Sequence, residues 1–133
     1  MSVGLMIVSH GQMGDYLLET ATQMLGVCPL STATLPVSFD SDPDLVLEQA
    51  ARMIERLDEG NGVLILTDMY GSTPTNIVNR LQGRYQLRIV AGVNLPMLIR
   101  ALNYPRLNLS ELANKALSGG RDGVVLCKPA TGT

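Results

Sequence analysis

Two short apolar runs, each followed by a polar turn, constrain the fold more than any other feature of this sequence. Residues 4–8 and 63–66 contain only glycine, methionine and branched aliphatic residues, a pattern typical of strands that are buried on both faces. The polar residues 9–11 end the first run, and residues 67–68 end the second. Because such strands need a helix layer on each side, the two runs predict a parallel α/β sheet.

Helical patterns occupy the chain between these strands. Apolar residues recur at helical spacing over residues 13–25 and stop at Gly26, which suits the C-terminal cap of a helix. Asp42 followed by Pro43 predicts the start of a second helix, which we expect to run to about residue 59. The same reasoning predicts further elements, namely strands at 32–37, 87–91 and 124–128, and helices at 74–81 behind a Thr73 cap, at 95–103 and at 109–117.

Strands that alternate with helices at this spacing form right-handed βαβ units. We therefore predict an α/β, doubly wound domain with a mainly parallel sheet in the order 2-1-3-4, helices on both faces and a short fifth strand near the C-terminus. The 133 residues contain no internal repeat, linker or low-complexity tract. We expect a single domain over residues 1–133, with a loose tail at 129–133.

Charge and hydropathy argue against two classes of partner. The chain has 10 Lys and Arg residues against 12 Asp and Glu residues, a formal charge of -2, without the basic cluster that nucleic-acid binding needs. Its apolar stretches are far shorter than the roughly 18 residues that span a membrane, and residues 1–8 lack the basic start of a signal peptide. We expect a cytoplasmic protein that binds no nucleic acid, does not insert into a membrane, and keeps Cys28 and Cys127 as reduced thiols.

Polar residues after the first and third predicted strands form a candidate site. His10, the sole histidine of the chain, and Asp68 follow neighbouring strands, so their side chains can meet at one edge of the sheet. An aspartate that accepts a hydrogen bond from one imidazole nitrogen leaves the other nitrogen as an oriented base or nucleophile. By spacing alone, both residues are as readily ordinary corner residues.

A helix start beside this pair favours an anion. The small residues Gly71, Ser72 and Thr73 precede Pro74, and the free N–H groups at a helix N-terminus attract negative charge. A nucleophilic imidazole next to such an anion-binding helix start points to phosphoryl chemistry. The helix start alone is weak evidence, because many capped helix starts bind nothing.

Other chemistries lack the residues they need. One histidine and two distant cysteines show no zinc-ligand spacing, so we expect no metal and no cofactor. The sequence has no Gly-x-Ser-x-Gly elbow, no Walker loop and no Gly-x-Gly-x-x-Gly after the first strand. An independent hydrolase, kinase or dehydrogenase is therefore disfavoured.

Four segments together carry a resemblance to a known family. They are Ser-His-Gly at 9–11, the run from Val to Pro at 63–74, Ala-Gly-Val-Asn-Leu-Pro-Met-Leu at 91–98, and Gly-Arg-Asp-Gly-Val at 120–124. In order and spacing they resemble the enzyme IIA domain of the mannose family of the bacterial phosphoenolpyruvate-dependent sugar phosphotransferase system. The resemblance covers residues 2–126.

The resemblance implies a phosphoryl carrier. His10 would accept a phosphoryl group from phospho-HPr and pass it to an enzyme IIB, which would be a separate protein, for sugar uptake. Asp68 would hold the Nδ1 proton of His10 so that Nε2 carries the phosphoryl group. The Thr73 hydroxyl and the N–H groups around Gly71 and Ser72 would steady the phosphate oxygens.

The family is also homodimeric through exchange of its final strand, a part that the predicted strand at 124–128 would play. This sequence departs from the family at Ser72, which stands where a second glycine is common. Ser72 would either tighten the approach of the phosphate or add a donor to it.

Three other functions remain open from the sequence. The chain could be a stand-alone regulator that reports phosphorylation state to a kinase or transcription factor, or the phosphotransfer subunit of a dihydroxyacetone kinase. Both need a phosphorylated His10. A non-catalytic interaction domain would instead keep its function after His10→Ala.

Overall fold

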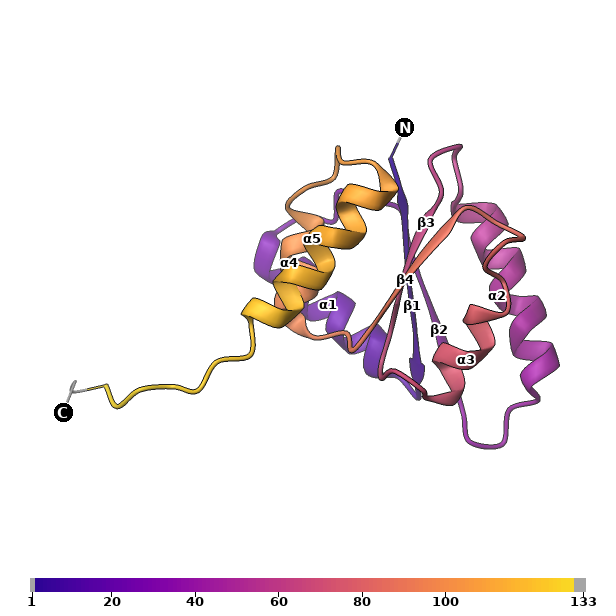
Figure 1. The fold of residues 1–133 in the computed structure, drawn as a ribbon, viewed down its shortest axis with the longest axis horizontal. Helices are drawn as coiled ribbons and strands as arrows, with labels where there is room; N and C mark the ends of the chain where they lie inside the picture. The colour runs from indigo at the N-terminus through magenta and orange to yellow at the C-terminus, as the bar shows by residue number, and fades with distance from the viewer. Residues whose placement is uncertain (1, 131–133) are drawn as a thin grey trace.

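The computed structural model describes residues 2–130, which form a four-stranded parallel sheet between two layers of helices (Figure 1). The strands lie in the order β2-β1-β3-β4, and all three neighbouring pairs are parallel. The predicted fold class and strand order are confirmed. The bounds of the strands are β1 (Gly4–His10), β2 (Thr32–Val37), β3 (Val63–Thr67) and β4 (Leu87–Ala91).

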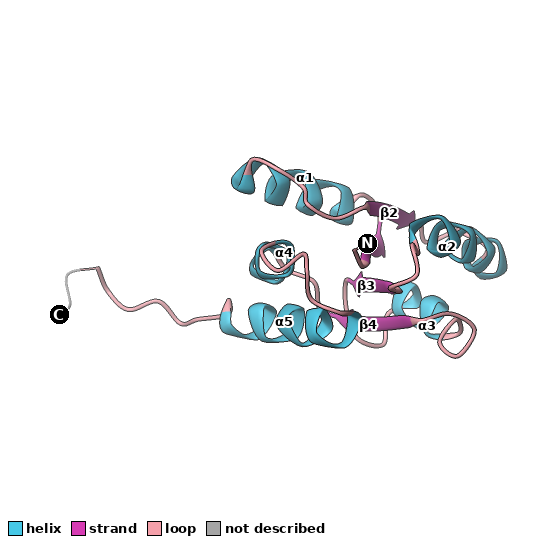
Figure 2. Cartoon of the chain, turned by 90° about the horizontal axis from the view of Figure 1, so that it is seen from above, coloured by secondary structure: helices cyan, strands magenta, loops and turns pink. Residues whose placement is uncertain are grey.

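Five helices cover the two faces of this sheet in the described part of the chain. Seen from above, α1, α4 and α5 lie on one face and α2 and α3 on the other (Figure 2). Their bounds are α1 (Met13–Leu25), α2 (Pro43–Leu57), α3 (Thr73–Asn79), α4 (Leu95–Leu102) and α5 (Leu109–Asp122).

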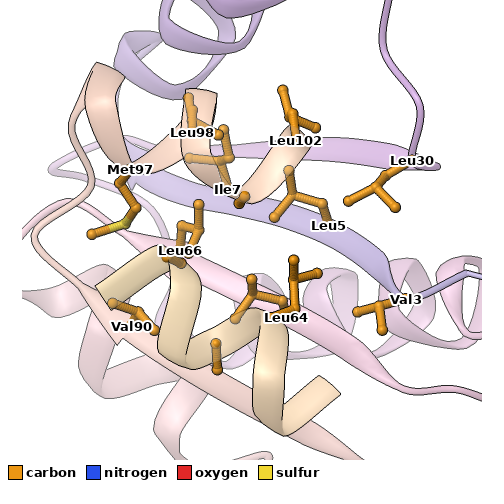
Figure 3. Packing of buried hydrophobic residues seen from close by; sticks show 14 of the residues in the cluster. Val3, Leu5, Ile7, Leu30, Leu64, Leu66, Val90, Met97, Leu98 and Leu102 are labelled. Atoms are coloured by element: carbon orange, nitrogen blue, oxygen red, sulfur yellow. The ribbon is translucent and has the colours of Figure 1, made fainter. Parts of the chain in front are cut away.

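The alternation of side chains along the central strands divides the core into two parts. In β1, Leu5 and Ile7 pack under α1, α4 and α5, while Met6 and Val8 pack against the opposite helix layer. In β3, Leu64 and Leu66 join the first part, as Figure 3 shows. Every residue of β3 is buried, so the uninterrupted apolar run follows from burial on both faces.

Helix α3 begins one residue earlier than expected. Ser72, not Thr73, is its N-cap, because the Ser72 side chain accepts from the Thr75 N–H. The helix ends at Asn79, two residues before the predicted end. The cap of α2 is confirmed, since the Asp42 carboxylate accepts from the Asp44 N–H at 3.0 Å.

Helix α5 continues through the two glycines that were expected to follow its end at residue 117. A Cβ atom on Gly119 would lie 2.6 Å from the Arg100 Cβ, and one on Gly120 would lie 2.7 Å from the Met97 Cε. The glycines therefore let α5 approach α4 closely instead of ending the helix.

The predicted fifth strand at 124–128 is wrong for the single chain. These residues form no strand and run away from the body of the protein (Figure 1), with Leu126 95% exposed. A strand needs a hydrogen-bonded neighbour, and this segment leaves the sheet without reaching one. Exchange between two subunits stays a prediction, and residues 131–133 of the expected loose tail lie outside the described residues.

Candidate functional site

His10 and Asp68 lie side by side where the direction of strand connection changes. Strand β1 pairs with β2 on one side and β3 on the other, and Val8 lies opposite Thr67 in the register. His10 Nδ1 is 2.7 Å from Asp68 Oδ2, and the His10 backbone N–H donates to the same oxygen at 2.9 Å. The structure thus brings together the two residues that the sequence placed on neighbouring strand ends.

The Asp68 carboxylate accepts hydrogen bonds on both oxygens. Oδ2 faces His10, and Oδ1 accepts from the Met69 N–H at 2.8 Å and from the Ser72 hydroxyl at 2.7 Å. Burial acts to raise the pKa of Asp68, but the hydrogen bonds from His10, Ser72 and Met69 together outweigh it and leave the pKa below its ordinary value. Asp68 is therefore ionised at neutral pH.

The charge of Asp68 decides which imidazole nitrogen carries the proton. An ionised carboxylate can only accept, so neutral His10 holds its proton on Nδ1 and leaves the lone pair on Nε2. Nε2 bonds to no other described residue. The His10 side chain is 35% exposed, against 10% for Asp68, so the imidazole is partly open to solvent while the carboxylate behind it is largely covered.

A buried hydroxyl network holds the Asp68 loop from behind. The Thr75 hydroxyl lies 2.7 Å from both the Met69 carbonyl oxygen and the Thr67 hydroxyl. It donates to the carbonyl and accepts from Thr67, because one hydroxyl has one proton to give. Thr75 was not among the predicted site residues, because its position in the first turn of a helix carries no signal for this role.

The three predicted phosphate-binding residues differ in what they offer. Ser72 is 7% exposed, with its hydroxyl on Asp68 and its N–H on the Met69 carbonyl. The serine in place of glycine thus supplies a donor to Asp68. Gly71 has a φ of +83°, which favours glycine, and among residues 2–130 the N–H groups of Gly71 and Thr73 donate to no acceptor.

A hollow of about 250 Å³ opens beside the imidazole and contains a residue that the sequence analysis missed. The Phe39 ring stacks on His10 with 5.1 Å between ring centroids and an interplanar angle of 30°. Phe39 follows β2, so the rule that places loops at the carboxyl ends of strands could have drawn attention to it. The lining is His10, Val37, Ser38, Phe39, Ser41, Pro43, Thr73 and Ile77.

The remainder of the described chain offers no competing site of comparable chemistry. A hollow of about 640 Å³ lies between α4 and α5 and has the Arg100–Asp122 ion pair on its wall, with no histidine or cysteine. Among residues 2–130, no three metal-ligating side chains cluster. None of the helices described has the length and apolar character to cross a membrane.

Comparison with known proteins points the same way. A family described as "PTS system fructose IIA component" (EIIA-man) matches residues 4–117. The chain is 29% identical over 131 residues to the mannose-specific EIIAB component of Escherichia coli K12, covering 96% of this chain and 40% of that protein. It is 32% identical over 116 residues to the transcriptional regulatory protein LevR of Bacillus subtilis, covering 83% of this chain and 12% of that protein.

The fold also matches a solved structure of the same type. The mannose/sorbose-specific IIA subunit of the phosphotransferase system from Enterococcus faecalis superimposes with a TM-score of 0.85 and 30% identity, over 97% of each chain. The chain spans about two fifths of the length of its EIIAB relative and about an eighth of LevR. The matched profile, the strand order and the shared fold establish that the chain belongs to the mannose-type IIA family of the sugar phosphotransferase system.

Proposed function

We propose that this protein is a phosphoryl carrier that accepts a phosphoryl group from phospho-HPr on His10 Nε2 and passes it to a separate enzyme IIB during sugar uptake. The observation that carries the proposal is the 2.7 Å contact between Nδ1 and the Asp68 carboxylate. This contact keeps the proton on Nδ1 and leaves Nε2 as the exposed nucleophile.

The geometry of His10 and Asp68 supports reversible transfer of a phosphoryl group. The Nε2 lone pair attacks phosphorus, a bond forms between them, and the bond from phosphorus to the donor breaks with its electron pair staying on the donor. Nδ1 keeps its proton, so the phosphorylated imidazole carries a positive charge beside Asp68. The carboxylate stabilises that charge as it develops, which lowers the barrier in both directions. An acceptor nucleophile on the enzyme IIB reverses the step.

The edge of the site offers places for the phosphate oxygens and for the partner proteins. Thr73 lines the hollow beside His10. Its hydroxyl would donate to the phosphate oxygens, together with the N–H groups of Thr73 and Gly71, which have no acceptor among residues 2–130. Met69 and Tyr70, directly after Asp68, are both exposed, an apolar rim suited to docking another protein. The proposed location is the cytoplasm, where the chain would meet these partners.

Exchange of the C-terminal segment would make the protein a homodimer. Val124, Val125 and Leu126 are all exposed in the single chain. Pairing these residues with the sheet of a second copy would bury them and satisfy their backbone groups.

A regulatory role is the second candidate, favoured by the 32% identity to LevR. The same His10 chemistry would then report phosphorylation state to a kinase or transcription factor. Deleting the gene in its host separates the two: a carrier loses uptake of a sugar, whereas a regulator changes transcription while uptake through existing permeases persists.

Incubation with phosphoenolpyruvate, enzyme I and HPr tests the shared chemistry. Intact mass and peptide mapping should show an acid-labile phosphoryl group on His10 in the wild type and none in His10→Ala. Asp122→Asn, at an exposed ion pair with Arg100 and outside the lining of the His10 hollow, is the matched control and should be modified like the wild type. A folded wild-type protein that gains no phosphoryl group would refute the proposal.

A further inference from the structure

We propose that Phe39 is a positioning residue for His10, because its ring stacks on the imidazole and fixes the plane in which Nε2 is presented. The effect on transfer rests on the function proposed above. The stacking distance of 5.1 Å lies in the range of attractive aromatic pairs. Phe39 belongs to no helix or strand and takes no direct part in the bond changes.

Core packing does not account for the position of this ring. Phe39 is 96% exposed, so it contributes almost no buried apolar area to folding. It is also the only phenylalanine of the chain. A large apolar ring that remains in water while touching the reactive histidine indicates a role at the site.

The loop that carries Phe39 is fixed on both sides of the ring. The Ser38 N–H donates to the Ser41 hydroxyl at 3.0 Å, and the Ser41 N–H donates to the Ser38 carbonyl at 3.1 Å. The Gly11 N–H donates to the Val37 carbonyl at 2.9 Å, which joins this loop to the corner after His10. The backbone that carries the ring is therefore fixed beside His10 by a closed turn.

Phe39 supplies a restraint that Asp68 cannot. The hydrogen bond to Asp68 fixes one atom of the imidazole, Nδ1, about which the ring can still tilt. A contact on the face of the ring opposes that tilt. Attack on phosphorus requires the Nε2 lone pair to point along the line of the breaking bond, and displacements of about 1 Å are costly in such reactions.

The test uses a donor that involves no protein. Phosphoramidate transfers its phosphoryl group to imidazole with release of ammonia, and His10, the sole histidine, is the only side chain of its kind that can react. We expect Phe39→Ala to react about 3- to 10-fold more slowly than the wild type. Phe39→Tyr keeps the ring and should restore the rate, whereas Phe39→Leu, apolar without a ring, should behave like alanine.

Parallel kinetics with phospho-HPr separate positioning from docking. Positioning predicts a lower kcat with little change in KM in Phe39→Ala, and an unchanged melting temperature because the side chain is exposed. A wild-type rate with phosphoramidate in Phe39→Ala, or a change confined to KM, would overturn the inference.

Failure of the proposed function gives a different result. A wild type that reacts with phosphoramidate but not with phospho-HPr would refute the carrier role and leave the role of Phe39 to be read from the variants. A wild type that neither phosphoramidate nor phospho-HPr modifies would overturn both, and one that phospho-HPr alone modifies would overturn the inference on Phe39 only.

Discussion

Replacing Asp68 with asparagine tests the central contact of the site at almost constant volume. The amide can place its oxygen toward His10 or toward Met69 and Ser72, but not both. Its NH₂ group then faces the backbone N–H of His10 or of Met69, each of which donates a hydrogen bond to the carboxylate of Asp68 in the wild type. Losing charge-assisted hydrogen bonds at a side chain that is only 10% exposed should lower the free energy of unfolding by about 1.5–3 kcal/mol.

The same substitution should also slow phosphoryl transfer. The positive charge that develops on the phosphorylated ring loses its carboxylate partner, a loss of about 1.5–3 kcal/mol that corresponds to a rate about 10- to 150-fold lower. Single-turnover transfer from phospho-HPr, followed by rapid quenching, measures this rate directly. Thermal melting of the same sample confirms that the variant is folded.

The pH dependence gives an independent check with a definite sign. The folded-state pKa of Asp68 lies below its ordinary value of 3.8, so its stabilisation is fully present above that value and is lost as the pH falls through the folded-state pKa. The stability difference between wild type and Asp68→Asn should therefore be constant near neutral pH and shrink in acid. Asp122→Asn, at an exposed ion pair, should show neither effect. Transfer by Asp68→Asn within about twofold of the wild-type rate would refute the assigned role.

Three further predictions concern the frame around the site. Gly119→Ala should lower the free energy of unfolding by about 1–3 kcal/mol, since its Cβ would lie 2.6 Å from the Arg100 Cβ; chemical denaturation measures the loss. Thr75→Val should cost about 1–3 kcal/mol and slow transfer, because the Thr67 hydroxyl loses a buried partner; melting and single-turnover rates together check it. Truncation after Gly123 should leave the melting temperature of a monomer unchanged, because the removed residues are exposed. If light scattering shows that the full chain is a dimer, the truncated chain should be a monomer.

The sequence predicted the sheet because its strongest signals have direct physical causes. Continuous apolar runs require burial on both faces, and parallel connections leave few strand orders, so the approach of His10 to Asp68 followed from topology. Phe39 escaped prediction because its contact with His10 depends on how a short loop turns after β2. No periodicity in the sequence encodes that turn.

The ends of elements were less predictable because two opposing effects compete there. Gly119 and Gly120 would end an isolated helix, yet in the fold they let α5 approach Arg100 and Met97 on α4. The segment after Gly123 has the composition of a strand, but pairing needs an edge that the single chain does not bring to it. Packing against α4 therefore overrode the low helix preference of the two glycines. The strand preference of the segment after Gly123 had no effect, because the segment found no strand to pair with.

The character of the hollow beside His10 fits a carrier better than a tight binding site. Its lining contains hydroxyl and apolar side chains but neither lysine nor arginine. A phosphoryl group on Nε2 would therefore meet neutral donors, such as the Thr73 hydroxyl, instead of a cation that holds it in a salt bridge. The Asp68 carboxylate acts on the ring from the opposite nitrogen. It would stabilise a phosphorylated imidazole without binding the phosphate, so the group would remain transferable to the next protein.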